Sequence, residues 1–341
     1  MRTRRDVLQG LGAVGAGLLA GPLLRGTAFG ATAVDFQLPA RACDCHVHIF
    51  DPANFPYTAK RVYTPPPALI SDLLDLHKAL RMDRVVIVQP SVYAADNACT
   101  LDAVKKLGAR ARGVAVIDKN TSQTEIDDMN GVGVRGIRLN LNTTPGGEVD
   151  ADGSKRTLDM AVKQLEGRKW HIQFYTRPPV IAALKAHIEQ LPFPVVFDHF
   201  GGARAADGSA QEGFEALLDL VKTGRAYVKI SGSYRASSKA PDYPDALPLA
   251  QTLIATNPDR LVWGSDWPHP DSSAGRGRPL TELTPPMAVD DSLVLNQLPK
   301  WTADQALRQK ILVENPARLY DFEDSDAIVT GSVPRQPAMA K

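Results

Sequence analysis

Two histidines separated by one residue, His46 and His48, carry the clearest chemical signal in this 341-residue chain. They belong to the run at residues 42–50, whose length and composition predict a β-strand. Because side chains alternate across a strand, we expect both imidazoles on one face, with Asp44 one step deeper and the intervening residues packed on the other face. Imidazoles at this spacing can bind a metal or surround a polarised carbonyl group; the alternative is a pair of buried histidines satisfied by ordinary hydrogen bonds.

The chain around these histidines alternates between strand-like and helix-like segments. Apolar runs predict strands at residues 42–50, 84–91, 113–118, 134–141, 171–175, 195–199, 226–231 and 261–266. Helical periodicity lies at residues 66–80, 97–107, 122–129, 157–165, 180–190, 212–222, 247–256 and 303–313. Eight such units, roughly 30 residues apart, predict an α/β fold with one (β/α)8 TIM barrel domain. An open doubly wound sheet is the alternative, but the first strand lacks the G-x-G-x-x-G of a dinucleotide fold.

Polar side chains recur where the predicted strands end. These residues are His46, His48, Ser91, Arg138, Tyr175, His199 and Asp266. In a TIM barrel the carboxyl ends of the strands form one mouth, so the sequence predicts that these groups converge there. Taken singly, each has a simpler explanation: Arg138 could pair with a neighbouring acid, Tyr175 could be half-buried core, and Asp266, like Asp198, could cap a loop.

The N-terminal segment has the pattern of an export signal. Arg4 and Arg5 precede the Gly- and Ala-rich apolar run 11–24, which is short for a membrane span, and Ala31-Thr32-Ala33 is a small-x-small cleavage site. Residues 1–33 therefore resemble a signal for the twin-arginine export machinery, with an uncleaved membrane anchor as the alternative. We expect a periplasmic or otherwise extracytoplasmic protein without stable membrane insertion, in which residues 34–323 form the barrel and 324–341 a disordered tail.

The composition and charge of the chain indicate which binding partners to expect. The chain has 39 basic and 38 acidic residues and no basic block outside the signal, so nucleic acid is not expected as a partner. Its three cysteines, Cys43, Cys45 and Cys99, do not make a disulfide framework and are interpreted as buried small hydrophobic residues.

Several motifs together resemble the amidohydrolase superfamily, and within it the 2-pyrone-4,6-dicarboxylate lactonase branch. They are His-x-His at 46–48, Val-Ile-Val-Gln-Pro-Ser at 86–91, Gly-Ile-Arg-Leu-Asn at 136–140, Val-Val-Phe-Asp-His-Phe-Gly at 195–201, Trp-Gly-Ser-Asp-Trp-Pro-His-Pro at 263–270 and Asn-Pro-Ala-Arg-Leu-Tyr at 315–320. The resemblance covers nearly all of the chain after the signal. It implies a lactonase, an enzyme that hydrolyses a cyclic ester.

The resemblance also implies roles for individual residues. Asp266 would be the general base for the hydrolytic water, and His46, His48 and His199 would polarise the lactone carbonyl. Substrate contacts would come from Tyr63, Ser91, Arg138, Tyr175 and Arg235, the two arginines as carboxylate ligands. These roles agree with the chemistry, because an ester carbonyl needs hydrogen-bond donors at its developing oxyanion and a carboxylate to accept the proton of water.

The sequence departs from the pattern of the lactonase branch at two positions. Carboxylate-binding arginines of the branch are replaced by Thr144 and Gly202. Loop arginines could substitute for them, the candidates being Arg177, Arg204, Arg276 and Arg278. We therefore expect a sugar-acid lactone or a muconolactone type of substrate in place of the planar dicarboxylate.

The expected site is metal-independent. His46, His48, His199 and Asp266 could hold a single Zn²⁺ or Mn²⁺. However, Tyr175 stands where many members of the superfamily have a histidine ligand, and Arg138 would place a cation beside the metal. A metal-dependent hydrolase or decarboxylase, a lactone isomerase, and an exported protein that binds an acidic sugar without turnover are the alternative functions.

Overall fold

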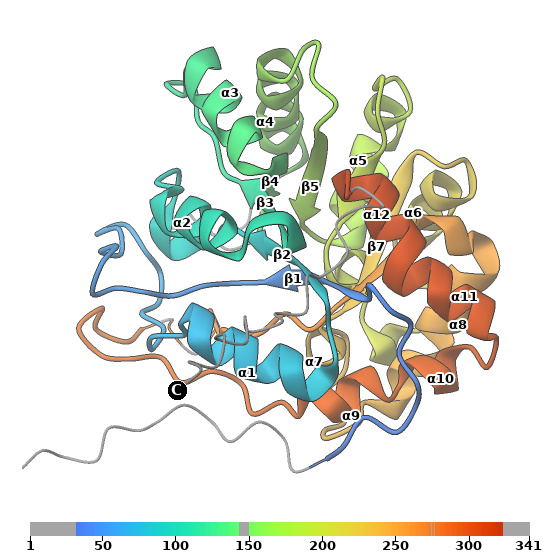
Figure 1. The fold of residues 1–341 in the computed structure, drawn as a ribbon. Helices are drawn as coiled ribbons and strands as arrows, with labels where there is room; N and C mark the ends of the chain where they lie inside the picture. Colours follow the sequence, from blue (N-terminus) through green and yellow to red (C-terminus); the bar gives the residue numbers. More distant parts are fainter. Residues whose placement is uncertain (1–31, 143–149, 274, 276, 323–341) are drawn as a thin grey trace, which may run out of the picture.

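The computed structural model describes residues 32–142, 150–273, 275 and 277–322. Eight parallel strands follow one another in chain order, and helices surround them, as Figure 1 shows. The predicted TIM barrel is therefore confirmed. The strands are β1 (Cys43–Val47), β2 (Arg84–Val88), β3 (Ala111–Ala115), β4 (Val134–Asn140), β5 (His171–Tyr175), β6 (Val195–Phe197), β7 (Ala226–Ser231) and β8 (Leu261–Gly264).

Long helices connect most of the strands, and a group of short ones follows β8. The helices are α1 (Ile70–Leu80), α2 (Ala98–Leu107), α3 (Gln123–Val132), α4 (Ala151–Gln164), α5 (Pro178–Ile188), α6 (Phe214–Lys222), α7 (Ser233–Ala236), α8 (Leu247–Thr256), α9 (Asp291–Leu295), α10 (Leu298–Trp301), α11 (Gln305–Gln309) and α12 (Asn315–Tyr320). The predicted helix at 303–313 continues to Tyr320, because a π-helical turn at Lys310–Glu314 joins α11 to α12. Pro316 is tolerated there because it lies in the first turn of α12.

Backbone hydrogen bonds between β1 and the end of β8 close the barrel. The Asp266 amide donates to the His46 carbonyl and the His48 amide to the Trp267 carbonyl, each at 2.8 Å. Gly264 allows this approach, because a Cβ at that position would lie 2.8 Å from the His46 nitrogen. The two histidines are thereby fixed against the strand that carries Asp266.

One prediction about β1 is wrong: Asp44 does not share a face with His46. The register against β2 shifts between Asp44 and Val47, where β1 has one extra residue. Such a bulge changes which side successive side chains take. Asp44 consequently accepts hydrogen bonds from the Ser265 backbone amide and hydroxyl, at 2.9 and 2.6 Å, and its carboxylate lies 3.5 Å from His77 of α1.

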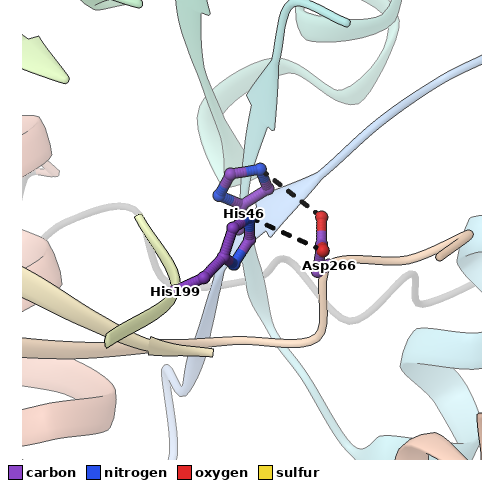
Figure 2. Close-up of side chains that lie close together, drawn as sticks. All are labelled: His46, His199 and Asp266. Carbon is purple, nitrogen blue, oxygen red and sulfur yellow. Dashed lines mark ion pairs between the residues drawn. The ribbon is translucent and has the colours of Figure 1, made fainter. Parts of the chain in front are cut away.

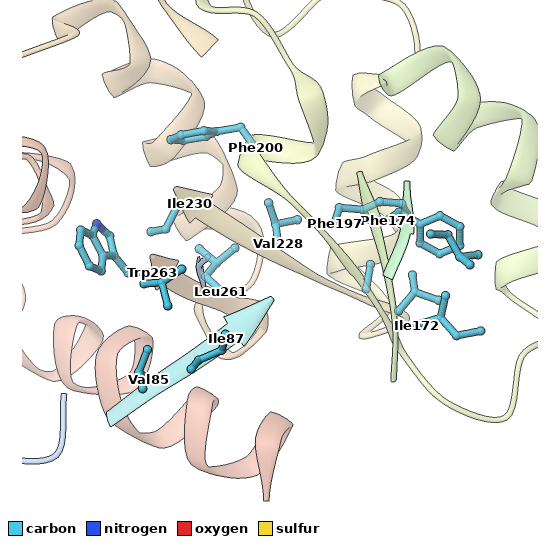
Figure 3. Close-up of a cluster of buried hydrophobic side chains, with 14 of the residues drawn as sticks. Val85, Ile87, Ile172, Phe174, Phe197, Phe200, Val228, Ile230, Leu261 and Trp263 are labelled. Atoms are coloured by element: carbon cyan, nitrogen blue, oxygen red, sulfur yellow. The ribbon is translucent and has the colours of Figure 1, made fainter. Parts of the chain in front are cut away.

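Two apolar clusters hold the barrel together. The larger lies between strands and helices and contains residues such as Val85, Ile87, Phe174 and Trp263, drawn in Figure 3. The smaller takes the alternate strand positions, which in a barrel face the interior. It contains Cys43, Cys45, Val86, Val88, Val114, Val196, Tyr227, Val262, Tyr320 and Phe322. As predicted, all three cysteines are free and buried.

The predicted export signal and tail lie almost entirely outside the described residues. Of the signal, only Thr32 and Ala33 are described, and the Ala33 carbonyl accepts a 2.9 Å hydrogen bond from Asn296. The next residue, Val34, is buried against the barrel. Within the described part of the chain, no helix has the length and apolar character needed to cross a membrane.

Candidate active site

A small cavity lies where the strands end, and most of the predicted site residues line it. Its volume is about 20 Å³, which is room for about one water molecule. The predicted residues in its wall are His48, Tyr63, Ser91, Arg138, Tyr175, His199 and Arg235. The other two predicted residues, His46 and Asp266, are fully buried one layer deeper. The structure therefore brings together all nine residues, although two of them do not reach the cavity.

The three histidines surround the Asp266 carboxylate, as Figure 2 shows for His46 and His199. The Nε2 atoms of His46 and His48 lie 3.6 and 3.4 Å from Asp266 Oδ1. His199 Nε2 lies 3.6 Å from the other oxygen, Oδ2. Three imidazoles and one carboxylate thus meet in a volume from which solvent is largely excluded.

The backbone is strained at this point. His199 has a φ of 49° and Asp266 a φ of 64°, in the left-handed region that costs a non-glycine residue about 1–2 kcal/mol. Such strain persists only where surrounding contacts impose it, and it concentrates at functional sites. The two strained residues are also close to each other, with His199 Nε2 lying 3.6 Å from Asp266 Oδ2.

Hydrogen bonds define the protonation of two of the histidines. The Lys229 ammonium of β7, which can only donate, lies 3.3 Å from His46 Nδ1, so the His46 proton is assigned to Nε2. That Nε2 lies 3.3 Å from His48 Nε2, and His48 Nδ1 donates to the Val88 carbonyl at 2.7 Å. These contacts form one continuous chain, Lys229 to His46 to His48 to Val88, in which every donor has an acceptor.

Asp198 joins this chain to Arg138. The Asp198 carboxylate lies 3.2 Å from His46 Nδ1 and 3.6 Å from Lys229 Nζ. It also accepts a 3.0 Å hydrogen bond from Arg138 Nε. The simpler explanation for Arg138 is thus correct in part: it has an acidic partner, which the sequence did not show, and it also lines the cavity.

Asp266 is held by groups on α7. Arg235 Nε and the Tyr234 hydroxyl both donate to Asp266 Oδ2, each at 2.5 Å. Burial alone would raise the pKa of Asp266, but the Arg235 guanidinium and the surrounding imidazoles hold this pKa well below its usual range. The carboxylate is therefore ionised at neutral pH.

The histidines are neutral at the same pH. Burial lowers the pKa of all three; it brings that of His199 to about 4, and the nearby Lys229 cation lowers that of His46 further. An ionised carboxylate beside neutral imidazoles is a combination that can accept a proton from water and donate hydrogen bonds to an oxyanion.

Sequence reasoning missed three residues of this network: Asp198, Lys229 and Tyr234. Lys229 gave a usable signal, since a lysine inside an apolar strand must find a partner when buried. Asp198 precedes His199 and was interpreted only as a loop cap. Tyr234 lies in α7, directly after β7, and had no distinguishing pattern in the sequence.

A family model described as amidohydrolase matches residues 43–322, which is the whole barrel. The chain belongs to the amidohydrolase family. Among curated relatives of this amidohydrolase, the 4-sulfomuconolactone hydrolase of Rhizobium radiobacter is 36% identical, over 84% of this chain and 92% of the relative. The 2-pyrone-4,6-dicarboxylate hydrolase of Comamonas testosteroni is 33% identical, again over 84% and 92%. The D-galactarolactone isomerase of Agrobacterium fabrum is 28% identical, over 85% and 94%.

The two replaced arginine positions of this amidohydrolase can now be located. Thr144 lies outside the described residues. Gly202, at φ 74°, packs so closely that a Cβ would lie 2.2 Å from the Thr176 carbonyl oxygen and 3.1 Å from the Arg177 Cα. No larger side chain fits there without rearrangement. The structure therefore explains why an arginine is absent at position 202.

A wider groove adjoins the cavity and carries two of the candidate substitutes. Its volume is about 940 Å³, and Tyr175, His199 and Arg235 line both spaces. Arg177 and Arg204 line the groove, whereas Arg278 is exposed and lines neither the cavity nor the groove. Arg276 lies outside the described residues. The groove thus offers cationic side chains next to the cavity.

Three buried groups of the amidohydrolase site, His46, His199 and Asp266, also lie close enough together to hold a divalent metal. Contacts of 3.3–3.6 Å join the Nε2 atoms and the Asp266 oxygens. Ligands about 2.0–2.1 Å from a tetrahedral zinc ion lie roughly 3.3 Å apart. The donor set, two imidazoles and a carboxylate, is also suited to Zn²⁺ or Mn²⁺.

Proposed function

We propose that this protein is a lactonase that hydrolyses the cyclic ester of a small carboxylated substrate. The convergence of Asp266 with His46, His48 and His199 at the barrel mouth is the observation that carries the proposal. The named relatives, two lactone hydrolases and a lactone isomerase, support the same substrate class. A sugar-acid lactone or a muconolactone type remains our expectation for the substrate.

The carbonyl group of the lactone would lie over His48 and His199, the two histidines in the cavity wall. As water attacks, the carbonyl oxygen becomes an oxyanion, which a neutral imidazole N–H group stabilises without the cost of burying another charge. His199 can supply this group from Nε2, because its Nδ1 lies 3.0 Å from the Ser231 hydroxyl, whereas the proton of His48 is already donated to the Val88 carbonyl. His46 would act through His48, to which it is hydrogen bonded. Tyr63, Ser91 and Tyr175 complete the wall around the substrate.

Asp266 would act as the general base. Its carboxylate accepts a proton from the attacking water, the ring C–O bond of the tetrahedral intermediate breaks, and the proton passes to the departing alkoxide. The product is a hydroxy acid, and the base is regenerated as a carboxylate. The reaction consumes one water molecule and needs no other co-reactant.

We favour the metal-independent form of this reaction. The buried site already holds three cations, Arg138, Lys229 and Arg235, against two carboxylates, Asp198 and Asp266. A divalent metal would add two more positive charges where attraction and repulsion are poorly screened. It would also need the unprotonated Nε2 of His46, which places the His46 proton on Nδ1, 3.3 Å from the Lys229 ammonium.

The metal-dependent alternative uses the same residues. His46, His48, His199 and Asp266 would hold Zn²⁺ or Mn²⁺, which polarises a carbonyl and acidifies a bound water. Asp198 favours this alternative. If His46 binds a metal through Nε2, its proton lies on Nδ1, and the Asp198 carboxylate, 3.2 Å away, could accept a hydrogen bond from it.

We also propose that the protein acts outside the cytoplasm. The paired arginines and apolar run at residues 1–33 support export by the twin-arginine machinery. A small carboxylated lactone in the periplasm would then be the substrate, and no nucleic acid is involved.

Turnover of carboxylated lactones by the purified enzyme tests the function. Wild type should open at least one sugar-acid or muconolactone-type lactone, and Asp266→Asn should be slower by about 10²–10⁴-fold with an unchanged circular dichroism spectrum. Asp207→Asn, which changes an exposed carboxylate on another loop, is the matched control. Near-normal turnover in Asp266→Asn would remove this residue from the mechanism.

A lactone isomerase is the second candidate, favoured by the 28% identical D-galactarolactone isomerase. In an isomerase a hydroxyl of the substrate replaces water as the nucleophile at the same site. Reaction in ¹⁸O-labelled water separates the two: a hydrolase introduces one ¹⁸O into the new carboxylate, and an isomerase introduces none. Tight binding of lactones without any turnover would instead indicate the binding-protein alternative.

A further inference from the structure

Arg235 covers the proposed base. Its Nε lies 2.5 Å from Asp266 Oδ2, and Nη2 donates to the Pro270 carbonyl at 3.1 Å. Asp266 has no exposed surface, whereas the Arg235 side chain is 18% exposed and lines both the cavity and the groove. In this arrangement a water molecule in the cavity meets the guanidinium group before it reaches the carboxylate.

The cavity must widen before a lactone can enter, because its volume of about 20 Å³ admits about one water molecule. Of the two arginines in its wall, Arg138 is buried and anchored by Asp198 at 3.0 Å. Arg235 comes from α7, a helix of four residues, and faces the open groove. Arg235 is therefore the side chain that can move.

A carboxylate on the substrate offers Arg235 the same partner that Asp266 does. Guanidinium groups bind carboxylates through parallel hydrogen bonds, so exchanging one carboxylate for another conserves the interaction. We propose that Arg235 leaves Asp266 for the carboxylate of the bound lactone, so that recognition of an anionic substrate uncovers the base. This inference rests on the lactonase function proposed above.

The exchange makes Arg235 a residue that determines specificity through the rate of the chemical step. When the guanidinium moves, Asp266 keeps the Tyr234 hydrogen bond and gains the freedom to accept a proton from water. A neutral lactone of the same ring lacks a group that competes for Arg235. The enzyme should therefore discriminate between charged and neutral lactones in kcat as well as in KM.

The test uses a carboxylated lactone that the enzyme opens and its carboxamide, which has the same ring without the charge. Wild type should turn over the carboxamide with a clearly lower kcat. Arg235→Met should lose kcat/KM on the carboxylated lactone and gain kcat on the carboxamide relative to wild type. Added acetate should raise the wild-type rate on the carboxamide, because a free carboxylate can draw Arg235 away, and should have no effect on Arg235→Met.

Two controls make the result specific. Arg156→Met removes an exposed arginine of α4 that lines neither the cavity nor the groove, and both of its rates should match those of wild type. Arg235→Lys keeps a cation and guards against misfolding of the methionine variant; it should shift the preference in the same direction by a smaller amount. Circular dichroism and thermal unfolding check that each variant is folded.

Each other outcome overturns the inference. An equal loss of kcat on both lactones in Arg235→Met would mean that Arg235 only supports Asp266. A raised KM for the carboxylated lactone, without a gain on the carboxamide, would mean that it only binds the substrate. If wild type opens no lactone, the proposed function fails, and that result differs from the two kinetic outcomes that would overturn the role of Arg235.

Discussion

Arg138 binds a buried carboxylate and also lines the cavity. Its Nε is bound to Asp198, and its Cζ lies 4.9 Å from the centre of the Tyr175 ring. Asp198 in turn contacts His46 and Lys229. A substitution at Arg138 therefore changes both substrate binding and the charge balance beneath the histidines.

Arg138→Lys separates these two effects better than removal of the charge. A lysine can still neutralise Asp198, but it cannot form the parallel hydrogen bonds of a guanidinium with a substrate carboxylate. We expect KM for a carboxylated lactone to rise by roughly tenfold or more, with a much smaller change for the carboxamide. Arg138→Met should show the same selectivity and also a lower Tm. Steady-state kinetics on both lactones decides; equal losses would show that Arg138 acts only through Asp198.

Activity should survive exhaustive treatment with a chelator. The reason is the charge already present, three buried cations against two carboxylates, together with the hydrogen bond from Lys229 to His46 Nδ1. Mass spectrometry of the purified protein gives its metal content, and rates before and after chelation give its importance. One metal per chain, with activity lost on removal and restored by Zn²⁺ or Mn²⁺, would establish the metal-dependent alternative.

The sequence predicted which residues meet at the mouth but not how they are connected. In a barrel, the position of a residue at the end of a strand is enough to place its side chain at the mouth, and His48, Ser91 and Arg138 were found in this way. The partners of Arg138 and Asp266 depend on side-chain contacts across the barrel, between β4 and the residue after β6 and between α7 and the segment after β8. Such pairs lie 60 and 32 residues apart in sequence, and no local pattern reports them.

At the level of elements, strand order and type were predictable and strand irregularities were not. The bounds of β5, β7 and α8 agree with their predicted ranges, because each is an apolar run with clear flanking residues. The bulge in β1 has no signature in the run 42–50, so the predicted face of Asp44 was wrong. His46, inside the bulge, packs against Gly264 of β8, where only a glycine allows the close approach, and this is a contact between distant parts of the chain.

Asp44 should accordingly contribute to stability and not to chemistry. It is fully buried and accepts hydrogen bonds from the Ser265 amide and hydroxyl, which ties β1 to the end of β8. Asp44→Ala leaves these donors without an acceptor, at a cost of about 1–3 kcal/mol for each. We expect urea unfolding to show a loss of several kcal/mol, with kcat of the folded enzyme reduced far less than in Asp266→Asn. An unchanged midpoint, like that expected for the exposed control Asp207→Ala, would contradict this role.

The barrel closes only when its first strand meets the end of its last strand. β1 pairs with the end of β8, and Tyr320 and Phe322, near the end of the described chain, pack with Cys43 and Cys45 in the barrel interior. The core is thus incomplete until nearly all of the chain has been synthesised. The export of such a fold by a route that carries folded proteins stays a prediction from the arginine pair of the signal.

Replacing Arg4 and Arg5 with lysine should therefore stop export without affecting the enzyme itself. The lysine variant keeps the charge and the apolar run but loses the paired arginines by which the twin-arginine machinery recognises its substrates. We expect wild type in the periplasmic fraction with a new N-terminus near Val34, and the variant in the cytoplasm with its signal uncleaved. Fractionation, N-terminal sequencing and lactonase assays of both fractions measure this, and purified variant and wild type should have equal kcat. A processed variant in the periplasm would mean that another route exports the chain, and uncleaved wild type in the membrane fraction would mean that residues 1–33 anchor it.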